Sequence, residues 1–112
     1  MDKLTAFKAL LFEANTAAKH AHGCCFGDKE DRVLALTYAA ACTAKSSAAE
    51  AIYWCSPELE NDDIPALLHR FDAFTNEIRE DYRTDHSRQW VDIEYNQLQE
   101  HYANVDYALK RL

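Results

Sequence analysis

The chain has 112 residues, of which 48% are hydrophobic and 28% charged, and its formal net charge is −7. This length suits one domain over residues 1–112 with a sizeable core, and the apolar share argues against a disordered chain. No apolar run approaches a membrane span, Met1-Asp2-Lys3 does not begin a signal peptide, and the four cysteines fit no disulfide framework. We therefore expect a cytoplasmic protein without a membrane partner.

Charge divides the chain into two unlike halves. Residues 1–56 carry six acidic and six basic side chains, whereas residues 57–112 carry thirteen acidic and six basic ones. The whole net charge thus falls in the second half, which should repel nucleic acid and membrane surfaces and attract a basic partner. The alternative is that this charge only keeps the protein soluble.

A first helix is predicted up to about residue 22. Apolar residues recur at steps of three and four, the spacing of one helix face; they are Leu4, Phe7, Leu11, Ala14, Ala18 and Ala21. We expect Gly23 to close this helix with a positive φ, which glycine adopts readily. Asp28 is predicted to cap the next helix.

A second helix is predicted over about residues 29–55, and it is apolar on most sides. One stripe is expected to face the core: Val33, Leu36, Ala40, Ala44, Ser47, Ala51 and Trp54. A second stripe lies about 100° away. A single bundle would leave this second stripe exposed to water. We therefore expect a homodimer whose interface contains Leu34, Tyr38, Ala41, Ala48 and Ile52.

Ser56-Pro57 should end this helix, since proline disfavours helix in the residue before it. An acidic connector follows, and Asp62 or Asp63 is predicted to cap a third helix with Pro65 in its first turn. Its core residues should be Ile64, Leu67, Leu68, Phe71, Phe74, Thr75, Ile78 and Tyr82.

The segment 83–87 contains mostly weak helix formers, and the apolar register changes across it. We therefore predict a turn there, with Thr84, Asp85 or Ser87 as the next cap. A fourth helix follows with a regular heptad: Val91, Tyr95, Leu98, Tyr102, Val105, Leu109 and Leu112. Four helices with short connections predict an all-α, antiparallel up-and-down four-helix bundle.

The segment KHAHGCC holds two histidines and two cysteines, residue types that bind metals. However, adjacent Cys24 and Cys25 point apart, and His20 and His22 lie on different sides of a helix. We interpret the segment as a bend rather than a metal or reactive-thiol site. No histidine has the Glu-x-x-His spacing of di-iron bundles, so no metal or other cofactor is expected.

One motif suggests an enzyme. The segment from Arg79 to His86 resembles the Arg-x4–6-His signature of HEPN ribonucleases, which are small all-α proteins and are often dimeric. The resemblance implies that Arg79 and His86 act on an RNA phosphodiester. Against this, Glu80, Asp81 and Asp85 would repel a phosphate backbone.

The function that we favour is non-catalytic, without direct contact to nucleic acid. We expect a protein that docks on another protein, as an inhibitor or regulator of the kind carried by phages or mobile elements. Its target would be a basic or nucleic-acid-binding protein. The predicted partner-binding residues are Glu58, Glu60, Asp62, Asp63, Ile93 and Tyr107, the last two because they face away from the core. A purely structural or adaptor bundle is the other alternative.

Overall fold

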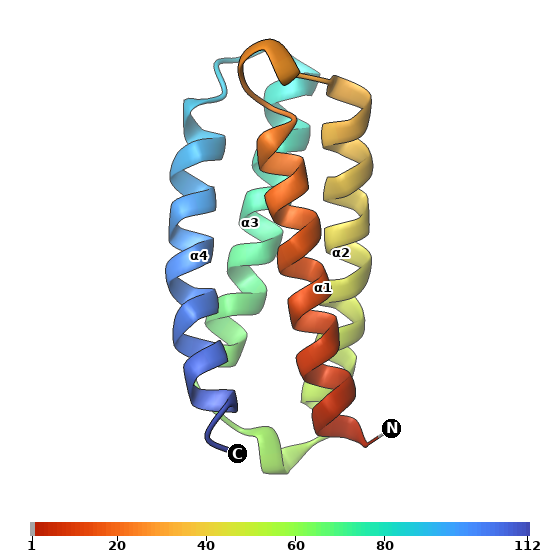
Figure 1. Cartoon of the computed structure of the whole chain (residues 1–112), viewed down its shortest axis with the longest axis vertical. Coiled ribbons are helices and arrows are strands. Elements are labelled where there is room, and N and C mark those ends of the chain that lie inside the picture. Colours follow the sequence, from red (N-terminus) through yellow and green to blue (C-terminus); the bar gives the residue numbers. More distant parts are fainter. Residues whose placement is uncertain (1) are drawn as a thin grey trace.

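The computed structural model describes residues 2–112 and confirms the predicted antiparallel bundle (Figure 1). Its helices are α1 (Lys3–Gly23), α2 (Arg32–Trp54), α3 (Asp63–Thr84) and α4 (Gln89–Leu109), with single 3-10 turns at Gly27–Lys29 and Pro57–Leu59. The bundle measures 43 × 22 × 20 Å.

The bundle has two ends of different construction. The α1–α2 loop, residues 24–31, and the α3–α4 turn, residues 85–88, lie together at one end, here called the loop end (Figure 1). The α2–α3 connector, residues 55–62, lies at the other, with both termini nearby. We call this the connector end.

Three of the four predicted core faces are confirmed. Every predicted core residue of α3 is buried, and α1 buries Phe7, Leu11 and its alanines along the predicted face. In α4 the heptad is buried at Val91, Leu98, Val105 and Leu109, while Tyr95 and Tyr102 are half-buried. Leu112 is the exception, because it lies beyond the end of α4 and is exposed.

The predicted core face of α2 is wrong. Six of its seven residues are exposed and Leu36 is half-buried, while the face that packs on the bundle is made of Ala35, Ala39, Cys42, Ser46 and Ala49. In α1 the alanines Ala14, Ala17, Ala18 and Ala21 are buried as well, and α1 and α2 have the most extensive contact of any helix pair. Small side chains let two helix axes approach closely, so bulk does not mark the buried side here.

The prediction that Gly23 needs a positive φ is also wrong. Gly23 is the last residue of α1, and the only glycine with a positive φ in residues 2–112 is Gly27, at +67°. The chain therefore reverses inside the 3-10 turn, four residues later than expected.

The helix caps differ from the predicted ones by a few residues. Asp31, rather than Asp28, caps α2, and its carboxylate accepts a hydrogen bond from the Leu34 amide at 3.0 Å. At α3 neither Asp62 nor Asp63 caps through its side chain; Asn61 Oδ1 accepts from the Asp63 amide at 2.8 Å. Of the predicted caps of α4, Ser87 Oγ accepts from the Gln89 amide at 3.3 Å.

Candidate functional site

The charges of the loop end are largely satisfied within the protein. Glu30 Oε2 lies 2.5 Å from Arg88 Nη2 and accepts a hydrogen bond from the Tyr82 hydroxyl at 3.0 Å. The guanidinium groups of Arg88 and Arg32 lie 4.5 and 5.2 Å from the centre of the Tyr82 ring. Burial and the bond to Glu30 raise the pKa of Tyr82. This cluster joins the α1–α2 loop to α3 and the α3–α4 turn.

The KHAHGCC segment forms the end of α1 and the following bend. Cys25 is buried and its thiol donates to the Ala21 carbonyl at 3.2 Å; burial raises its pKa to about 11, so it stays a thiol at neutral pH. His22 contacts Asp92 at 2.9 Å and stacks on Tyr95, while His20 stacks on a ring of α2. Over residues 2–112, no three His, Cys, Asp or Glu side chains are placed to hold a metal ion.

The connector end holds the predicted acidic residues, and most of them are unpaired. Glu60, Asp62 and Asp63 are exposed and form no ion pair within the described chain, whereas Glu58 lies 3.4 Å from Lys3 Nζ. The pKa of Glu58 is lowered, first by a bond from its own backbone amide and then by Lys3. Since an exposed ion pair of this kind contributes little, even Glu58 is available to a partner.

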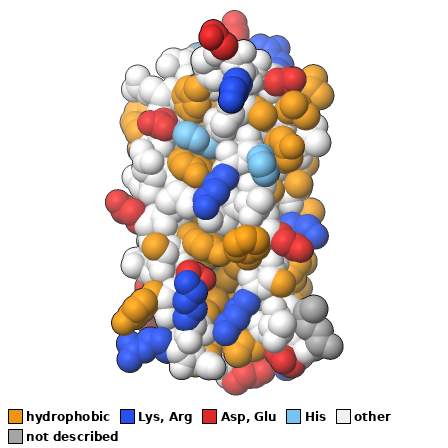
Figure 2. Space-filling model, viewed as in Figure 1, with side chains coloured by type: hydrophobic (Ala, Val, Ile, Leu, Met, Phe, Trp, Pro, Cys, Tyr) orange, Lys and Arg blue, Asp and Glu red, His pale blue; other side chains and the backbone are white. Residues whose placement is uncertain are grey.

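Hollows with apolar walls lie beside these carboxylates. One, of about 90 Å³, is bounded by the connector, Ile64 and the end of α4, including Leu109 and Leu112. Another, of about 130 Å³, is lined by Tyr53, Trp54, Ser56, Pro57 and Glu60. The connector end therefore combines negative charge with small apolar recesses. Figure 2 shows acidic side chains at this lower edge, with lysine or arginine side chains beside and just above them.

The predicted residues of α4 do not form one site with the connector. Tyr107 is 65% exposed near the connector end, where Arg111 lies 5.5 Å from its ring centre. Ile93, 38% exposed, lies 14 residues earlier on α4, which corresponds to about 21 Å along the helix. Only Tyr107 is therefore close enough to extend the connector surface.

The predicted dimer residues lie along the edge of α2 that borders α1. Leu34, Ala41 and Ala48 are exposed. Tyr38 and Ile52 are half-buried, and Tyr38 stacks on His20 with ring centres 5.0 Å apart. The middle of the outer face is instead formed by residues of the predicted core face, such as Ala40, Ala44 and Ala51.

Arg79 and His86 are not brought together. Arg79 Nη2 donates to Asn76 Oδ1 at 2.5 Å, on α3, and lies 3.5 Å from Thr75 Oγ1. His86 follows the end of α3 and lines an open hollow of about 530 Å³ with residues of the α1–α2 loop, to which Arg79 does not contribute. The geometry thus adds no support to the HEPN resemblance.

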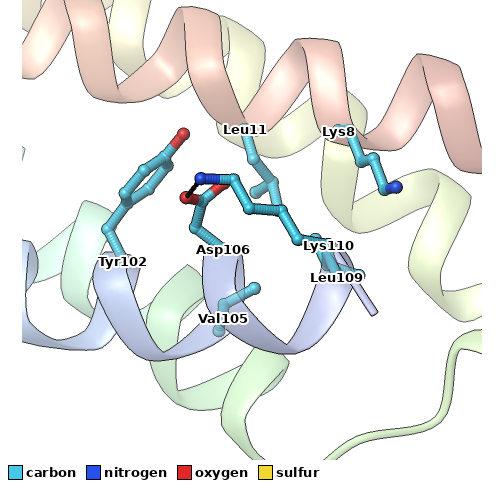
Figure 3. A pocket seen from close by; sticks show the side chains of 7 residues that line it. All are labelled: Lys8, Leu11, Tyr102, Val105, Asp106, Leu109 and Lys110. Atoms are coloured by element: carbon cyan, nitrogen blue, oxygen red, sulfur yellow. Dashed lines mark ion pairs between the residues drawn. The ribbon is translucent and has the colours of Figure 1, made fainter. Parts of the chain in front are cut away.

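A further small pocket, of about 150 Å³, lies between α1 and α4 (Figure 3). Leu11, Val105 and Leu109 form its apolar part, and the side chains of Asp106 and Lys110 form an ion pair of 2.9 Å across its α4 side. These two charges neutralise each other, but Lys8 of α1 also lines the pocket and has no ion pair among the described residues, so a positive charge lies beside the apolar floor. None of the predicted site residues lines it.

Sequence reasoning missed two groups of residues. Trp54, which is predicted to face the core, is exposed and walls the hollow beside Glu60 together with Tyr53, and the adjacency of aromatic residues to the acidic connector was the available signal. Glu77 and Asp81, one helical turn apart on α3, form an acidic pair in which burial and Asp81 raise the pKa of Glu77 to about 7. Asp81 is buried and its Oδ2 has no hydrogen-bond partner.

Comparison of the chain with protein-family models, with curated proteins and with solved structures finds no match. None of the described helices combines the length and apolarity that crossing a bilayer would require.

Proposed function

We propose that this protein acts without catalysis, by docking its acidic connector end on a basic surface of another protein. The observation that carries the proposal is the group of exposed carboxylates, Glu58, Glu60, Asp62 and Asp63, of which only Glu58 has an ion pair in the described structure. Charge that stabilises a fold is normally paired or caps a helix, and Asn61 already provides the cap of α3.

The partner that fits best is a nucleic-acid-binding protein. Such a protein presents lysines and arginines to phosphates, and a small acidic bundle competes for the same surface. Regulation or inhibition of this kind is the role that we infer, of the sort used by phages and mobile elements. Complementary charge would speed association more than it increases affinity.

We also propose that a second copy covers the outer face of α2, making a homodimer. Ten residues form this outer strip, and none is charged: Val33, Leu34, Thr37, Ala40, Ala41, Ala44, Ser47, Ala48, Ala51 and Cys55. The nearest charges are on its borders, where Lys45 is paired with Glu13 at 3.2 Å and Glu50 lies toward α3.

The size and pattern of the outer strip favour an antiparallel pairing of two copies. The 23 residues of α2 extend about 34 Å, and half the surface of such a helix is about 600 Å² per copy, near the lower limit of stable interfaces. The strip is also nearly symmetric about Ala44: residues 41 and 47, 40 and 48, 37 and 51, and 33 and 55 lie at equal distances from it. A two-fold axis at Ala44 would therefore pair small with small residues along most of the strip.

Cysteine cross-linking tests this arrangement, in a chain with Cys24→Ser and Cys55→Ser. Ala44→Cys should form a disulfide-linked dimer, whereas Ala40→Cys alone should not, because its counterpart is Ala48 of the other copy. Ala103→Cys on the outer face of α4 is the matched control. A monomeric mass by light scattering at high concentration, or cross-linking of Ala40→Cys as efficient as that of Ala44→Cys, would contradict the antiparallel dimer.

The docking function is tested by affinity capture from the native host. The tagged wild-type chain should retain a basic protein that is lost with Glu58→Lys plus Glu60→Lys. The matched control is Asp28→Lys plus Glu100→Lys, which changes two exposed, unpaired carboxylates elsewhere by the same total charge. Equal loss in both variants would show that the net charge matters and the connector end does not.

A further inference from the structure

Trp54 is the last residue of α2, and its indole is 68% exposed beside the acidic connector. It lies between two hollows. The first is the 130 Å³ hollow with Tyr53, Ser56 and Glu60, and the second, of about 170 Å³, contains Glu50 and Asp72. Each side of this indole is therefore bordered by at least one carboxylate.

The indole is held in place by its neighbours. Trp54 Nε1 lies 3.5 Å from Glu50 Oε2, and its ring meets that of Tyr53 edge-on, with centres 5.1 Å apart. An aromatic face carries negative potential, so a cation over it is attracted by the ring and by the nearby carboxylates together.

Ser56 provides a second observation in the first hollow. The residue is 1% exposed, and its hydroxyl oxygen has no hydrogen-bond partner among the described residues. Buried hydroxyl groups normally have partners, and the Ser56 hydroxyl could accept a hydrogen bond from a bound group once its side chain turns toward the hollow.

The loop end shows the same components with the cation in place. There, Glu30 and the Tyr82 hydroxyl adjoin the guanidinium of Arg88, which lies over the Tyr82 ring. At the connector end an aromatic ring, a carboxylate and a hydroxyl group again lie together. No cation of the described chain lies over the ring of Trp54.

We infer that the first hollow, formed by Tyr53, Trp54, Ser56 and Glu60, binds an arginine side chain of the basic partner. Its volume of about 130 Å³ is well below the ~300–1,000 Å³ of drug-sized sites and suits one long side chain. A planar guanidinium can stack on the indole and donate hydrogen bonds within its plane to Glu60 and Ser56. An ammonium group is not planar and cannot stack in this way while making both hydrogen bonds. This inference rests on the proposed function and adds the residue type that is recognised.

The test uses a hexa-arginine peptide and a hexalysine peptide, titrated calorimetrically into the full chain at low ionic strength. Hexa-arginine should bind more tightly than hexalysine. Trp54→Leu leaves the net charge unchanged and should weaken hexa-arginine binding by about tenfold. The matched control is Trp90→Leu, because Trp90 is 54% exposed but lies at the start of α4, at the loop end.

Glu60→Gln and Ser56→Ala should each weaken binding several-fold, and circular dichroism checks that the variants fold. Affinity that is unchanged in Trp54→Leu, or equally reduced in Trp90→Leu, would overturn the arginine site. Equal affinity of the wild type for hexalysine would overturn the choice of arginine. None of these results would remove the docking proposal, which fails separately if charge reversal at Glu58 and Glu60 leaves capture intact.

Discussion

At the loop end, Arg88 lies over Tyr82 and contacts Glu30, whereas at the connector end Trp54 and Glu60 have no cation beside them. Similar groups therefore have different consequences at the two ends. Where an arginine of the chain completes the cluster, the charges hold two loops together and contribute to stability. Where it is missing, the carboxylates contribute little to the fold and remain available to a partner.

The largest effect on stability should come from removing the arginine of the loop end. Arg88→Ala leaves Glu30 without its cation and exposes the Tyr82 ring, so we expect a loss of about 2 kcal/mol in the free energy of unfolding. Arg111→Ala, which removes an exposed arginine near the connector end, should cost less than about 0.5 kcal/mol. Urea unfolding followed by circular dichroism measures both, and equal losses would contradict the contrast between the ends.

The two glycines of the loop end should respond differently to alanine. Gly27→Ala forces a side chain into a φ of +67° and should cost about 1 kcal/mol. Gly23 lies in α1 without a positive φ, and a Cβ there would meet nothing within 4 Å. Gly23→Ala should therefore be neutral or slightly stabilising, and thermal unfolding of the two variants should rank them in this order. A greater loss at Gly23 would show that the bend is placed wrongly.

A pH effect is expected from Glu77, which pairs with Asp81 near the loop end. Its pKa is about 7 in the folded chain, above the ordinary value of 4.5, so the folded state binds this proton more tightly than the unfolded state. The contribution of this proton to the free energy of unfolding should therefore be fully present below about pH 4.5 and be lost as the pH rises through 7. The loss should be no more than about 1 kcal/mol, because the site is partly solvated.

Glu77→Gln should remove most of this slope and stabilise the protein at pH 8. Glu100→Gln, an exposed glutamate of α4, is the matched control and should leave the slope unchanged. Free energies of unfolding at pH 5, 6, 7 and 8 make the comparison. A slope that persists in Glu77→Gln would assign the pH dependence to another group.

The smallest effect on stability should follow from changes at the connector. Glu60→Gln removes an exposed carboxylate without an ion pair, and we expect a change within about 0.3 kcal/mol. A loss of more than 1 kcal/mol in the same urea experiment would mean that Glu60 has a structural role, contrary to the difference drawn between the ends.

The sequence was sufficient for the fold wherever bulk and periodicity agree. In α3 the large apolar residues follow one face and are buried there, and in α4 the predicted heptad is buried at Val91, Leu98, Val105 and Leu109. In α2 alanine occurs on every side, so periodicity could not separate the face that packs on α1 from the outer strip. The close approach of α2 to α1 determines which face of α2 is buried. That contact involves residues 20 or more positions apart in the chain, so the periodicity of α2 alone does not reveal it.

The candidate site was predicted only in part, for a related reason. The carboxylates of the connector were recognisable as a local run of charge. The hollow beside Glu60 depends on how Trp54 and Ser56 are turned at the end of α2, which the apolar spacing does not specify. Ile93 was included because it faces outward. However, outward-facing positions occur along the whole length of α4, so this criterion does not indicate which end of the bundle binds a partner.

The association rate measured against ionic strength tests the central proposal most directly, once the captured partner has been purified. The wild-type chain should associate quickly at low salt and slow steeply as salt is added. Glu58→Lys plus Glu60→Lys should associate more slowly and with a shallower salt dependence, while Asp28→Lys plus Glu100→Lys should stay close to the wild type. Identical rates and slopes for the wild type and the connector variant would contradict docking through the connector end.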